Sequence, residues 1–90
     1  MPYIKQDDRG PIDEAIEAAV HNVRLTPGKV DGPANYAVTK LLLGVFEPAG
    51  YADMARVLGC VEAVKLEFYR RFAAPYEDKK AKENGDVYHE

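Results

Sequence analysis

The sequence predicts an all-α protein built from two short amphipathic helices and one long C-terminal helix. Two segments carry apolar residues at i, i+3, i+4, i+7, i+8 and i+11, the repeat expected for one face of a helix. A third, longer segment carries an apolar stripe from Met54 to Phe72. Glycine and proline lie between the segments, where they separate helices. We therefore expect a single helical domain over residues 1–90, with residues 1–10 as an N-terminal arm and 86–90 as a C-terminal tail.

The N-terminal arm shows no helical repeat and is expected to be extended. It either docks through Tyr3 and Ile4 on its own domain or on a neighbouring subunit, or is frayed at the terminus. Gly10-Pro11 then begins the first helix, because the N–H that proline lacks has no partner in a first turn. The apolar residues of this helix are mostly small, so another helix can approach closely. They are Ile12, Ala15, Ile16, Ala19, Val20 and Val23.

Residues 25–33 contain two prolines and two glycines and predict a long loop. The second helix is expected to begin at Pro33 or Ala34 and to end at Phe46, before the turn at 47–50. Because its stripe has the same spacing as the first, the two helices are expected to form an antiparallel pair. The stripe consists of Ala34, Ala37, Val38, Leu41, Leu42 and Val45.

The third helix is expected to begin near 51–53 and to end at Asn84-Gly85. Its main stripe is Met54, Val57, Leu58, Val61, Val64, Phe68 and Phe72. A second strip, on another side, is Leu66, Tyr69, Ala73 and Tyr76. Pro75 cannot donate a hydrogen bond to Arg71, so the helix is expected to kink or restart there.

The length of the third helix predicts self-association. If straight, residues 53–83 span roughly 45 Å, whereas a compact chain of this size has a radius of gyration of about 12 Å. Two short helices cannot cover both apolar strips of such a rod. Either Pro75 folds the helix back or another subunit covers it, and we expect a homo-oligomer with the third helix at its centre.

Composition excludes several classes of protein. A net charge of -3 with 30% charged residues is typical of a soluble protein and argues against a partner such as long nucleic acid. Half of the basic residues nevertheless lie close together, at Lys65, Arg70, Arg71, Lys79, Lys80 and Lys82. A single cysteine, Cys60, allows no intrachain disulfide and favours the cytoplasm. No signal-peptide pattern occurs, and the longest apolar run, 41–46, is too short to enter a membrane as a span.

No catalytic pattern is present, so the sequence predicts neither an enzyme nor a cofactor or metal. The two histidines and one cysteine have no metal-ligand spacing, serine is absent, and no phosphate-binding glycine loop occurs. A cluster of tyrosine and basic side chains suits an anionic, nucleotide-like ligand. The tyrosine ring can stack on a base, and the arginine guanidinium can donate two parallel hydrogen bonds to a phosphate. The alternative is ordinary salt bridges, such as Glu67 with Arg71, beside interface tyrosines. The candidate ligand-binding residues are Lys65, Tyr69, Arg70, Arg71, Tyr76, Lys79 and Lys80.

Three stretches, MPYIK at the start, NYAVTKLL over 35–42 and VKLEFYRRFAAPYEDKKAKENGDVY over 64–88, resemble an uncharacterised family of short proteins from bacteriophages, prophages and bacteria. The chain departs from the family in a longer PGKVDGPANY link and in Ala63, where the family has cysteine. The resemblance implies a phage setting but no activity and no site residues.

By analogy of size and context, small helical phage proteins include oligomeric sponges that sequester cyclic-nucleotide immune signals. The lead hypothesis is therefore a non-enzymatic anti-defence sponge that holds cyclic oligonucleotides at subunit interfaces. The alternative is a structural or protein–protein interaction module that binds a host or phage protein through the aromatic strip of the long helix.

Overall fold

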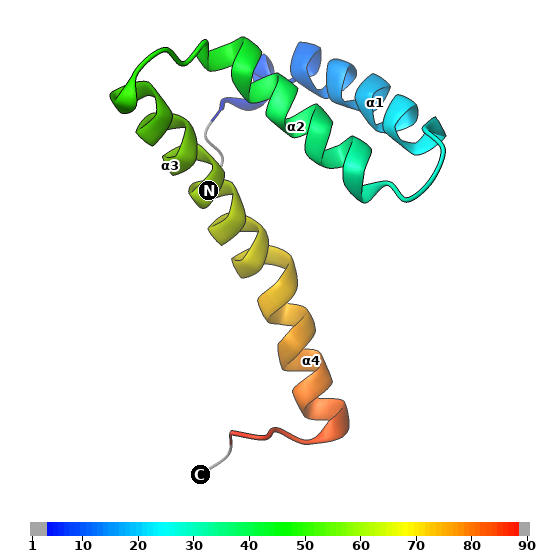
Figure 1. Cartoon of the computed structure of the whole chain (residues 1–90). Coiled ribbons are helices and arrows are strands. Elements are labelled where there is room, and N and C mark those ends of the chain that lie inside the picture. The colour runs from blue at the N-terminus through cyan, green and yellow to red at the C-terminus, as the bar shows by residue number, and fades with distance from the viewer. Residues whose placement is uncertain (1–3, 89–90) are drawn as a thin grey trace. The chain divides into compact units, whose positions relative to one another are not determined.

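The computed structural model describes residues 4–88, and helices account for most of them (Figure 1). Two helices of 16 residues are followed by one helical run of 34 residues, and the described part of the chain contains no strand. The prediction of an all-α chain with a long last helix is thus confirmed. The chain divides into two compact units, Met1–Glu47 and Pro48–Glu90, which are described separately.

The first unit begins with a short 3₁₀ helix, η1 (Gln6–Asp8), where the sequence predicted an extended arm. The Asp8 N–H donates to the Lys5 carbonyl at 2.9 Å, and the Arg9 side chain donates to the Ile4 carbonyl at 3.2 Å. These local hydrogen bonds hold the segment in a turn. An extended chain would leave the same donors without these partners. Tyr3, the other residue expected to anchor the arm, lies outside the described residues.

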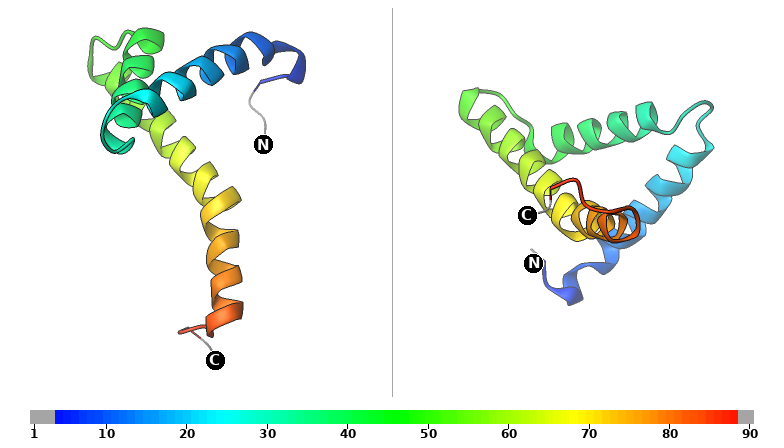
Figure 2. Two further views of the ribbon diagram at one scale, coloured as in Figure 1. Left: turned by 90° about the vertical axis from the view of Figure 1, so that its right-hand side faces the viewer. Right: turned by 90° about the horizontal axis from the view of Figure 1, so that it is seen from below.

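Helices α1 (Gly10–Leu25) and α2 (Asp31–Phe46) form the expected antiparallel hairpin, and they splay apart from the loop between them (Figures 1 and 2). The loop is shorter than predicted because Gly32 and Pro33 belong to the first turn of α2. That position suits them, since backbone N–H groups there have no intrahelical partner. Helix α2 ends at Phe46, and the next residue, Glu47, adopts the left-handed conformation with φ 44° before Pro48.

The second unit is one continuous helical run made of α3 (Tyr51–Phe68), η2 (Tyr69–Ala73) and α4 (Ala74–Asn84). The run begins where the Asp53 carboxylate accepts the Ala49 N–H at 3.0 Å, and it ends before Gly85, whose φ is 87°. Both boundaries agree with the prediction.

The interruption expected at Pro75 takes the form of a π turn, η2, directly before it. The Ala74 N–H donates to the Tyr69 carbonyl, five residues back instead of four. Proline lacks an N–H, and its ring would clash with the carbonyl four residues earlier in a regular α-helix. The wider π turn takes up this mismatch, so the helix passes through Pro75 without ending.

Among the described residues, neither unit buries a side chain. Every residue from 4 to 88 is exposed or half-buried, including all the large apolar residues. Tyr88 in the tail is 89% exposed. No helix within the described residues combines the length and apolar character needed to span a membrane.

Candidate functional site

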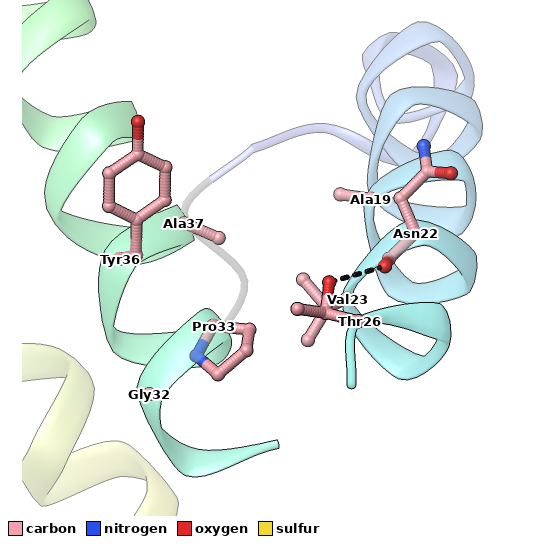
Figure 3. Close-up of a pocket in the computed structure, with 8 residues that line it drawn as sticks. All are labelled: Ala19, Asn22, Val23, Thr26, Gly32, Pro33, Tyr36 and Ala37. Carbon is pink, nitrogen blue, oxygen red and sulfur yellow. Dashed lines mark hydrogen bonds between the residues drawn. The ribbon is translucent and has the colours of Figure 1, made fainter. Parts of the chain in front are cut away.

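The hairpin of the first unit contains an open groove between its two helices (Figure 3). Ala19 and Val23 line it from α1, and Pro33 and Ala37 line it from α2. A second groove on the same hairpin places Ala15, Ile16 and Ala19 opposite Ala37, Val38 and Leu41. The two predicted stripes therefore face each other. No charged side chain lines the groove of Figure 3, so it offers nothing to hold an anion.

The seven predicted ligand-binding residues all lie on the long helical run of the second unit. Lys65 is in the last turn of α3, and the π turn η2 carries three more of them in succession. The others are on α4. The three on η2 are Tyr69, Arg70 and Arg71, and those on α4 are Tyr76, Lys79 and Lys80.

Both arginines bind the carboxylate of Glu67. Arg70 Nη2 lies 3.0 Å from Glu67 Oε1, and Arg71 Nε lies 2.7 Å from the same oxygen. The hydrogen bond from Arg71, aided by the charge of Arg70, holds the pKa of Glu67 well below its ordinary value against the opposing effect of desolvation. Glu67 is thus ionised at neutral pH, and any anionic ligand of these arginines must compete with it.

The phenol of Tyr69 donates a hydrogen bond to Glu77 Oε1 at 2.8 Å. This bond and the negative charge of Glu77 raise the pKa of the Tyr69 phenol. The two residues are eight positions apart, whereas two turns of a regular α-helix take about 7.2 residues. The extra residue of the π turn therefore brings Tyr69 and Glu77 onto the same face.

Acidic residues also accompany two of the lysines. Lys65 Nζ lies 3.6 Å from Glu62, and Lys80 Nζ lies 3.2 Å from Glu83 and 5.6 Å from the centre of the Tyr76 ring. Lys79 makes no ion pair with another described residue. Six basic and five acidic side chains are interspersed between positions 62 and 83, so their charges nearly cancel.

The candidate cluster thus forms two separate groups. One is the pair of arginines around Glu67, and the other is Lys80 against Tyr76. The two groups hold different carboxylates, Glu67 and Glu83. Within residues 4–88, no three metal-ligand side chains gather together.

A family model described as a domain of unknown function (DUF6899) matches residues 1–87. The chain belongs to this family. This agrees with the resemblance to an uncharacterised family that its motifs indicate. No curated protein and no solved structure matches the chain.

An exposed apolar surface of the second unit runs along the same helix. The Phe68 and Phe72 rings lie 5.1 Å apart at 44°, and these residues are 62% and 61% exposed. Tyr76 is 61% exposed. We call this surface the long-helix strip, and define it as Met54, Val57, Val61, Val64, Phe68, Phe72 and Tyr76.

The sequence predicted the pairing of Glu67 with Arg71, but neither the second bond from Arg70 nor the role of Glu77 as the acceptor for Tyr69. Glu67 lies three and four residues before the arginines, so its double pairing is visible in the spacing. Glu77 could not be matched to Tyr69 without knowing that a π turn adds a residue between them. The only signal for that turn is Pro75, which predicts a disturbance of the helix but not its form.

Proposed function

We propose that the chain is a non-enzymatic helical interaction module that binds protein through the long-helix strip. The observation that carries this proposal is the exposure of the strip, whose three aromatic residues are each more than half accessible. Burying a side chain such as phenylalanine contributes about 1.5–3 kcal/mol. A continuous row of such side chains on one helix face therefore favours contact with an apolar surface.

The charges beside the strip support the same function. Arg70 and Arg71 are held by Glu67, and Lys65 and Lys80 lie beside acids of their own helix. No position of the strip carries a charged side chain. A partner can therefore cover the strip without removing an unpaired charge from water, which would cost several kcal/mol.

Site-specific photo-crosslinking tests this function. Benzoylphenylalanine in place of Phe72 is compared with the same residue in place of Lys79, which lies on the same helical run outside the strip. Illumination of bacterial cells that express each variant is expected to produce a protein adduct from position 72 and little or none from position 79. Equal adducts from both positions, or none from position 72, would contradict the proposal.

A second candidate function is supported by the position of Tyr69, Arg70 and Arg71 on the π turn, since π turns often occur at functional sites. In this alternative, the chain is a phage anti-defence sponge in the cytoplasm of the host. It would hold cyclic oligonucleotides at the interface between subunits, with tyrosine rings against bases and arginines against phosphates.

Thermal unfolding with a panel of mono-, di- and cyclic oligonucleotides tests the second candidate. A ligand at a hundred times its Kd adds about 2.7 kcal/mol of stability, which raises the Tm of a domain of this size by several degrees. The variant Glu67→Gln weakens the competitor for both arginines and is expected to enlarge the shift, whereas Arg70→Ala reduces it. If no nucleotide of the panel raises the Tm of the wild type or of Glu67→Gln, the second candidate function is wrong.

A further inference from the structure

The π turn keeps the long-helix strip on one face of the helix. Each residue of a regular α-helix adds about 100° of rotation, so Tyr76 would lie about 80° from the centre of the row from Met54 to Phe68. The one additional residue of η2 turns the following segment back by about 100°. Tyr76 then lies about 20° from the centre of the row. The hydrogen bond from Tyr69 to Glu77, across eight residues, shows this change of phase directly.

The corrected phase makes the strip long and continuous. It runs over 23 positions from Met54 to Tyr76, or about 33 Å of helix. Its repeat follows alternating spacings of three and four residues, apart from the extra residue within η2. This repeat is the one with which two helices pack side by side in a left-handed pair.

We infer that a second copy of this chain covers the long-helix strip, so that two copies pair along their long helices. This inference rests on the proposed function and names the partner. The three aromatic side chains expose roughly 370 Å² per copy, because each offers 150–250 Å² and about six-tenths of it is accessible. The four aliphatic side chains add roughly 200 Å², which brings the exposed part of the strip to roughly 600 Å² per copy. A symmetric pair would bury roughly 1,200 Å² in total, the lower bound for a specific, stable interface.

A second copy matches the strip in length and in chemistry. Its own strip has the same length, about 33 Å, and the same uncharged positions. A twofold pair brings these identical surfaces together.

The test compares molar mass by light scattering for two matched variants. Phe72→Asp places a charge on the strip, whereas Leu66→Asp places one about 160° away on the same helix. The two wild-type side chains are similarly exposed, at 61% and 59%. The wild type and Leu66→Asp are expected to have at least twice the 10.0 kDa mass of one chain, and Phe72→Asp is expected to have the mass of one. A monomeric wild type, or loss of association in Leu66→Asp, would overturn the inference.

A conservative variant keeps the test decisive if Phe72→Asp does not fold. Phe72→Leu retains an apolar side chain and is expected to keep the wild-type mass, and the Tm of both is expected to rise with protein concentration. A folded monomer with a Tm independent of concentration overturns the inference. If such a monomer still gives a protein adduct from position 72, the proposed function survives and the partner is a different protein. If it gives no adduct, both fail.

Discussion

Replacement of Phe72 by alanine gives the most informative measurement of the energy held in the long-helix strip. The side chain is 61% exposed, which corresponds to about 120 Å² of apolar surface that a partner can cover. Truncation to alanine removes about 80 Å² of this surface, or about 2 kcal/mol at 25 cal/mol per Å². Both copies lose this contact in a symmetric pair. The expected loss is therefore about 4 kcal/mol, which corresponds to a dissociation constant about 10³-fold weaker.

Sedimentation equilibrium over a wide range of concentrations measures this change. Phe72→Leu serves as the graded variant, because a buried apolar side chain of similar size costs less than about 1.5 kcal/mol. Leu66→Ala serves as the control on the opposite side of the helix. A Phe72→Ala dissociation constant within about threefold of wild type, or an equal effect of Leu66→Ala, would refute the assignment of the strip as the contact surface.

Three further predictions concern local features of the helices. Glu47→Gly is expected to raise the stability of the folded chain by about 1 kcal/mol, because a residue with a β-carbon is strained at φ 44°. Thermal unfolding measures this gain, with Glu47→Ala as the control that keeps the β-carbon. Asp53→Ala removes the acceptor of the Ala49 N–H and is expected to cost about 1 kcal/mol in chemical unfolding, with Asp13→Ala as a comparison in the first turn of α1. The Glu67 carboxyl is expected to titrate below its ordinary pKa of 4.5 in an NMR titration, and Arg71→Gln is expected to raise that value. Because the folded-state pKa is lowered, the stability that Glu67 contributes is complete above 4.5 and is lost as the pH falls through the lowered value. A Glu67 midpoint at 4.5 or above would contradict the pairing with the arginines.

Much of the fold could be predicted from the apolar repeat and from the glycine and proline residues at helix ends. The apolar repeat located all three helices, and Gly10-Pro11 and Asn84-Gly85 marked their outer boundaries correctly. The start of α2 was placed too late because Gly32 and Pro33 were assigned to the loop. Both residue types are also tolerated in a first helical turn, so composition alone could not distinguish the two positions.

The site was harder to predict because it depends on the phase of one helix. Regular α-helical spacing placed Tyr76 with Leu66 and Tyr69 and away from Phe68. The π turn returns Tyr76 to the row that contains Phe72, and it also aligns Tyr69 with Glu77. A proline indicates that the helix must adjust, but a kink, a break and a π turn all satisfy the same constraint. The pairing of both arginines with Glu67, by contrast, follows from spacings of three and four residues.

The central claim, that a second copy covers the long-helix strip, is tested most directly by NMR on a mixture of isotope-labelled and unlabelled chains. Filtered spectra of the mixture report only contacts between different copies. The Phe68 and Phe72 rings of one copy are expected to show such contacts to side chains of the long-helix strip in the other, including its methyl groups. Ring-to-methyl contacts confined to a single chain, in a folded sample, would contradict the claim.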